Sequence, residues 1–157
     1  MKKILVMLPL LSVLLCLNSF LSFAQEETPI MQLECQILEN NVECNSSVRS
    51  TTFIDTSIEV GYSKTEGMII YITTSMNTTA SVVGAKDIEI QIEDGNDWVT
   101  VATSTGGEFY NTGVCVLGLT YPDPIEGKKY RVVCTHYGNV NGYRELYHET
   151  NGFKCVY

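Results

Sequence analysis

The sequence predicts an all-β fold, an antiparallel sandwich of about seven strands that follows a cleaved signal peptide. From residue 54 onward, apolar and polar residues alternate with a period of two, and helical periodicity is absent. Turn residues interrupt this pattern about every eight to twelve positions, a spacing that is typical of sandwich strands. Ahead of it, residues 1–24 carry the positive charge and the apolar run of a secretory signal peptide, which we call the leader.

The leader begins with Lys2 and Lys3, and its apolar run extends from Ile4 to Phe23. Small residues then mark a cleavage site that ends at Ala24. We therefore expect a secreted, extracellular protein that has no membrane span once the leader is removed. Two alternatives stay open: an uncleaved anchor, because the run is long enough to cross a bilayer, and a lipid on Cys16.

The remaining chain divides into two parts by composition. Residues 25–53 are polar and are predicted to be a loosely structured N-terminal segment. Residues 54–157 are predicted to be one β-sandwich domain, since a chain of this length suits a single core. Within that domain, residues 103–113 are predicted to be a loop.

The charge balance is acidic, with 18 Asp and Glu against 10 Lys and Arg and a net charge of −8. Removal of the leader would take away two of the lysines. Nucleic acids are bound through clusters of cationic side chains, and this chain has no such cluster. The expected partner is therefore an unknown protein or a glycan, and not a nucleic acid.

The cysteines indicate disulfides, because secretion places them in an oxidising compartment. No C-x-x-C pair occurs, which argues against a thioredoxin-type site and a zinc ribbon. We predict that Cys35 pairs with Cys44 across a short loop and that Cys115 pairs with Cys134 across the core. Cys155 is then left free, although a Cys134–Cys155 bridge is an open alternative.

The clearest single element is a hairpin over residues 88–101, which alternates strictly on both sides of the turn at 95–96. This register makes two apolar cross-strand pairs: Ile92 with Val99 and Ile90 with Val101. It also places Trp98 opposite Glu93, on the polar face of the hairpin.

A further stretch resembles the E–F corner of immunoglobulin-like and fibronectin-type-III-like sandwiches. The residues that carry this resemblance are Leu119-x-Tyr121-Pro122 and Gly127-Lys-Lys-Tyr130-x-Val132-x-Cys134. The resemblance implies that Tyr130 is a structural corner tyrosine, whose hydroxyl bonds the preceding backbone.

Over about residues 55–150 the chain also resembles small secreted proteins of unknown function from Gram-positive bacteria. Three segments carry that resemblance: Lys86-Asp-Ile-Glu-Ile-Gln, Asp97-Trp-Val-x-Val and Gly127-Lys-Lys-Tyr-Arg. It supports the fold and implies no activity.

Catalytic chemistry is not predicted. The only histidines are His136 and His148, and no Gly-x-Ser-x-Gly elbow occurs. The acidic turn at 94–97 fails the calcium-loop pattern, because Thr105 stands where a bidentate Glu is needed. The two histidines, on one hairpin, are interpreted as surface residues rather than zinc or copper ligands. We therefore predict no metal, no cofactor and no catalytic residue.

Four aromatic residues are the candidates for ligand binding: Trp98, Tyr137, Tyr143 and Tyr147. Exposed aromatic rings on a sheet stack on sugars or form hot spots for protein binding. The alternative for Trp98 is that the N-terminal segment covers it, through Leu33 or Ile37, or that cross-strand neighbours do. The expected function is a secreted non-enzymatic binding module. A carbohydrate-binding accessory domain is the alternative, and a small secreted hydrolase comes third.

Overall fold

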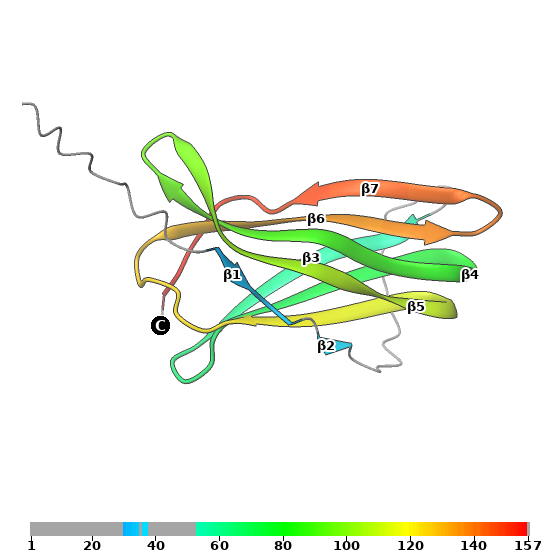
Figure 1. The fold of residues 1–157 in the computed structure, drawn as a ribbon, viewed down its shortest axis with the longest axis horizontal. Coiled ribbons are helices and arrows are strands. Elements are labelled where there is room, and N and C mark those ends of the chain that lie inside the picture. The colour runs from blue at the N-terminus through cyan, green and yellow to red at the C-terminus, as the bar shows by residue number, and fades with distance from the viewer. Residues whose placement is uncertain (1–29, 35, 38–52, 157) are drawn as a thin grey trace, which may run out of the picture.

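The computed structural model describes residues 30–34, 36–37 and 53–156, and every regular element in these ranges is a strand (Figure 1). The all-β prediction is confirmed. Within the same ranges, no helix is long and apolar enough to span a membrane. The predicted leader and the Cys35–Cys44 pair lie outside the described residues.

Eight strands form one sheet, in the order β1-β5-β4-β6-β7, with β3 beside β4, β2 beside β5 and β8 beside β6. Their bounds are β1 Met31–Gln32, β2 Gln36–Ile37, β3 Phe53–Ser63, β4 Gly67–Asp94, β5 Asp97–Tyr121, β6 Lys129–Asn139, β7 Tyr143–Glu149 and β8 Phe153–Lys154. All pairings are antiparallel except that of β1 with β5, which is parallel. The expectation of a purely antiparallel arrangement is therefore wrong for β1.

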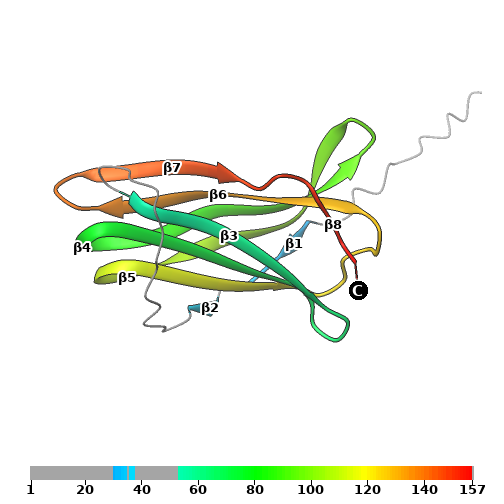
Figure 2. The same cartoon turned by 180° about the vertical axis from the view of Figure 1, so that it is seen from behind.

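The sheet folds over because β4 and β5 each take part in two layers. Residues 67–75 of β4 pair with β3 and with residues 114–121 of β5; we call this the β3 layer. The remainder of β4, from residue 80, pairs with the first part of β5 and with β6; together with β7 this is the β6 layer. Figures 1 and 2 show β4 and β5 reversing at one end of the molecule, so that the two layers face each other.

Residues 103–113 are strand, and their assignment as a loop is wrong. They continue β5 and pair with residues 80–89 of β4. A glycine is needed there, because Gly106 has a φ of +83° and an added Cβ would lie 2.0 Å from the carbonyl oxygen of Ala85. The polar and glycine-rich composition therefore reflects close strand packing at this point, and not a loop.

The hairpin turns as predicted, with Asp94 paired to Asp97 and Ile92 paired to Val99. Ile90, however, pairs with Ala102, because the register shifts between Ile90 and Gln91. The predicted Ile90–Val101 pair is therefore wrong by one residue. Irregularities of this kind insert an extra residue in one strand, and strict alternation does not reveal them.

The core lies between the two layers and draws on both of them. Its largest fully buried apolar side chains are Tyr130, Met68, Ile70, Ile72, Ile88, Ile90, Leu117, Leu119, Val83 and Val132. At one end of the core, the hydroxyl of Tyr130 accepts a hydrogen bond from the backbone N–H of Ile125 at 2.8 Å. This is the contact that a corner tyrosine is expected to make.

The three described cysteines, Cys115, Cys134 and Cys155, are all buried. No disulfide joins any two of them, so the predicted Cys115–Cys134 bridge is not formed in the structure. Cys155 also carries a free thiol. It lies beside the corner, where its N–H donates to the carbonyl of Lys128.

Candidate functional site

The outward side of the β6 layer, which we call the outer face, carries all four predicted binding residues. On β6, Cys134 and His136 point into the core, so alternation turns Tyr137 outward. Cross-strand partners share a face, and Tyr143 and Tyr147 of β7 pair with Asn139 and Thr135 of β6. Trp98 of β5 pairs with Glu93 of β4, as the hairpin register predicted.

Trp98 is covered by cations from β6. The guanidinium carbon of Arg131 lies 4.7 Å from the ring centroid, and the Lys129 ammonium lies 5.5 Å from it. Lys129 also binds Glu93 at 2.8 Å, which fixes its position over the ring. Cations stack favourably on the electron-rich face of an indole. The cover of Trp98 therefore comes from cross-strand neighbours, while Leu33 of the N-terminal segment packs against the core.

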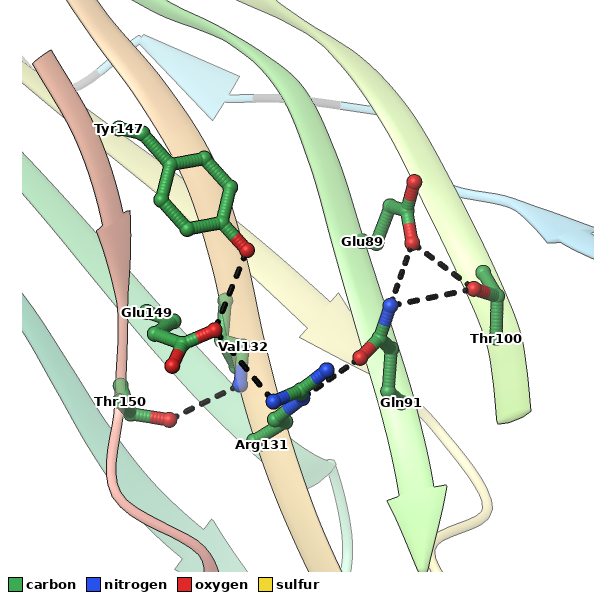
Figure 3. A network of polar contacts seen from close by, with 8 residues as sticks. All are labelled: Glu89, Gln91, Thr100, Arg131, Val132, Tyr147, Glu149 and Thr150. Carbon is green, nitrogen blue, oxygen red and sulfur yellow. Dashed lines mark hydrogen bonds and ion pairs between the residues drawn. The ribbon is translucent and has the colours of Figure 1, made fainter. Parts of the chain in front are cut away.

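A hydrogen-bonded network crosses the outer face from β5 to β7, and Figure 3 shows Arg131 at its centre. Arg131 donates to the amide oxygen of Gln91 at 2.6 Å and to the carboxylate of Glu149 at 3.3 Å. The hydroxyl of Tyr147 donates to the same Glu149 oxygen at 3.2 Å. Three planar polar groups are therefore aligned beside one tyrosine ring.

The network continues across β4 to β5. The amide of Gln91 donates to the carboxylate of Glu89 at 2.7 Å, and the hydroxyl of Thr100 donates to the same carboxylate oxygen at 2.8 Å. These side chains hold one another in place, so the surface is pre-ordered before any ligand arrives. Pre-ordering lowers the entropic cost of binding.

A second cluster lies toward the other end of the outer face. The rings of Tyr137 and Tyr143 have centroids 5.8 Å apart, and the Lys86 ammonium lies 5.9 Å from each. Lys86 also binds Glu145 at 2.5 Å. On the far side, Glu108 accepts hydrogen bonds from Tyr110 and from Tyr137. These two hydroxyls lower the pKa of the Glu108 carboxyl, Tyr110 more strongly than Tyr137.

The four candidates differ in what they offer to a ligand. Tyr147 is 62% exposed and Tyr143 is 48% exposed, whereas Tyr137 is only 8% exposed. Burial is the first cause that raises the pKa of the Tyr137 phenol, and the Glu108 hydrogen bond is the second. Tyr143 and Tyr147 are thus the rings that a ligand can reach. Tyr137 and Trp98 are engaged by neighbouring side chains and support the face.

Three charged residues of the outer face are not among the site residues that the sequence predicts: Lys86, Arg131 and Glu149. Arg131 alternates with the buried Tyr130 and Val132, so its outward direction could be predicted from the sequence pattern. Its position beside Gln91, however, depends on the register of β4 against β6, which are far apart in sequence. Local patterns do not carry that information.

The interpretation of both histidines as surface residues is wrong for His136, which is fully buried. It shares the inward side of β6 with Cys134 and contacts the half-buried His148 of β7. Among the residues that the structure describes, no group of three or more His, Cys, Asp or Glu side chains is arranged to hold a metal ion.

Comparisons of the chain with protein-family models, with curated proteins and with solved structures found no match.

Proposed function

We propose that the protein is a secreted, non-enzymatic binding module that uses the outer face of the β6 layer. One observation carries the proposal. The four aromatic residues singled out in the sequence lie on this one face, two of them exposed and all of them beside charged side chains. Exposed tyrosine and arginine side chains are the types that dominate binding hot spots.

The proposal includes an immunoglobulin-like sandwich and export by the leader. The Tyr130–Ile125 hydrogen bond and the single core between two layers support the fold. The charged start and apolar run of residues 1–24 support export. Such sandwiches commonly serve as scaffolds that present a surface to partners.

A carbohydrate-binding accessory domain is the second candidate, and the network around Tyr147 favours it. An exposed ring offers a flat apolar surface to a pyranose, and planar amide, guanidinium and carboxylate groups bond to sugar hydroxyls. Arg131, Gln91 and Glu149 place such groups in one row beside Tyr147. No comparable row is found elsewhere among the described hydrogen bonds.

The test is binding of the mature protein to a glycan array and to an extracellular-protein array. The variant is Tyr143→Ala with Tyr147→Ala, and the control is Tyr71→Ala, because Tyr71 is 42% exposed on the β3 layer. We expect the double variant to bind at least about tenfold more weakly and the control to bind as the parent does. Binding to glycans that the double variant loses would favour the carbohydrate-binding accessory domain.

Equal binding by the parent and the double variant would remove the outer face as the site. Loss of binding in the Tyr71→Ala control would place the site on the β3 layer instead. Both variants change exposed side chains only, so circular dichroism and the denaturation midpoint should match the parent.

A further inference from the structure

Two histidine rings lie on the inner side of the β6 layer, where β6 and β7 pair. They are the only histidines in the sequence. His136 of β6 is fully buried, and its Nε2 lies 3.1 Å from Nδ1 of His148 on β7. A buried titratable ring is costly to charge, and His136 is such a ring.

The contacts of His136 assign its tautomer. The hydroxyl of Thr74 donates to the carbonyl oxygen of Gly84 at 3.1 Å, so its oxygen is left to accept. Nδ1 of His136 lies 2.7 Å from that oxygen and therefore carries the proton. Nε2 is then a lone-pair acceptor, and Nδ1–H of His148 donates to it. The chain of hydrogen bonds joins the β3 layer, through Thr74, to β6 and β7.

A second donor also faces Nε2. The thiol of Cys134 lies 3.5 Å from it. Burial raises the pKa of that thiol to about 12, so the thiol stays neutral and keeps its proton. A proton added to Nε2 would meet both His148 N–H and Cys134 S–H, and one or both would have to turn away. None of the described hydrogen-bond partners of His136, namely Thr74, Cys134 and His148, carries a negative charge that would compensate.

The strand that carries His148 also carries the exposed part of the outer face. Tyr147 and Glu149 flank His148 in sequence and point outward, and Tyr143 lies on the same strand. An antiparallel backbone ladder from Val133–Glu149 to Asn139–Tyr143 joins β7 to β6, and on the outer side the Glu145–Lys86 and Glu149–Arg131 ion pairs add to it. On the inner side, the described polar contact is the histidine pair.

We propose that the His136–His148 pair is an acid-sensitive latch. When the pair takes up a proton, β7 separates from β6 and carries Tyr143 and Tyr147 out of the outer face. The release of the strand does not depend on the proposed function. The consequence for ligand binding rests on it.

The pH range follows from the environment of the rings. Burial lowers the pKa of His136 to about 4, with a smaller effect from His148, and burial lowers the pKa of His148 as well. The pair is therefore neutral at neutral pH, and in the folded protein it takes up a proton only as the pH falls well below 6.5, the ordinary histidine value. The hydrogen bond from Lys86 lowers the pKa of the Glu145 carboxyl, so that the Lys86–Glu145 ion pair persists through most of this range.

The test is hydrogen exchange of the backbone amides in the mature protein, compared as protection factors at about pH 7 and about pH 4.5. We expect the amides of residues 143–149 to lose about tenfold or more of their protection in acid. The amides that pair β3 with β4 should lose less protection than those of residues 143–149. In His136→Gln, the side-chain amide oxygen can still accept from His148 N–H but the residue cannot be charged, so β7 should stay protected at the lower pH.

Three results would overturn the latch: equal protection of β7 at both pH values, an equal loss of protection in all strands, or the same acid loss in His136→Gln. Should that variant fail to fold, NMR titration of the two ring C–H signals in the parent decides. Two rings that titrate at the ordinary histidine value would contradict a buried pair. All of these measurements are made without ligand, so they stand apart from a failure of the array experiment.

Discussion

The corner tyrosine offers the sharpest test of the fold. Tyr130→Phe keeps the ring and removes one hydroxyl from a side chain that is 0% exposed. The lost contact is the hydrogen bond from the Ile125 N–H, at 2.8 Å. The ring still fills its place between the layers, so no cavity forms and the change isolates one hydrogen bond.

The size of the effect depends on what the Ile125 N–H finds afterwards. A net hydrogen bond contributes about 0.5–1.5 kcal/mol, and a donor stranded away from water adds about 1–3 kcal/mol. The Ile125 residue is 57% exposed, so water can reach its backbone after a small movement. We therefore expect a loss of about 1 kcal/mol in the free energy of unfolding, toward the lower end of the combined range.

The assay is denaturant unfolding of the parent and of Tyr130→Phe, with Tyr71→Phe as an exposed control. The variant's midpoint should fall while the slope of free energy against denaturant stays the same. The control should match the parent. Equal midpoints for Tyr130→Phe and the parent would show that the hydroxyl does not stabilise the corner, and the support it gives to an immunoglobulin-like fold would be lost.

Three further predictions concern other parts of the molecule. The pKa of His136 is 6.5 in the unfolded chain and about 4 in the folded chain, so the free energy of unfolding falls by about 3 kcal/mol in all as the pH drops through this range. Denaturation midpoints measured at several pH values should show that fall, and a flat profile would contradict it. Gly106→Ala should lower the free energy of unfolding by about 1–3 kcal/mol, because Gly106 has a φ of +83° and the new Cβ would lie 2.0 Å from the Ala85 carbonyl oxygen. An unchanged thermal midpoint would refute that packing. Arg131→Ala should red-shift the fluorescence emission of Trp98, the single tryptophan, because the guanidinium that shields the ring from water lies 4.7 Å from its centroid. An unchanged spectrum would mean that Arg131 does not shield the ring.

The local sequence pattern was sufficient to predict residue pairing where a strand pairs with the next strand along the chain. The alternation on both sides of the Gly95-Asn96 turn placed Trp98 opposite Glu93, and the structure has that pair. The same rule could have placed His136 inside, because it lies two residues from Cys134 on one strand and so shares its face. Assigning it to the surface followed residue type instead of register.

The register between strands that are far apart along the chain could not be predicted from the sequence. Nothing local shows that residues 67–75 and 80–94 of β4 join different layers, or that residues 103–113 continue β5 through the bend. The backbone of that stretch pairs with residues 80–89 of β4, which a composition-based assignment does not reveal. The alignment of Arg131 with Gln91 and Glu149 comes from this register, so the network on the outer face was equally hidden.

Binding of a ligand to the outer face of the β6 layer is tested most directly by a hydrogen-exchange difference map of the mature protein, taken with and without the strongest array hit. We expect slower exchange in β7 and in the adjoining part of β6, with the amides of β3 unchanged. Slower exchange in β3 and around Tyr71, with β7 unchanged, would contradict it.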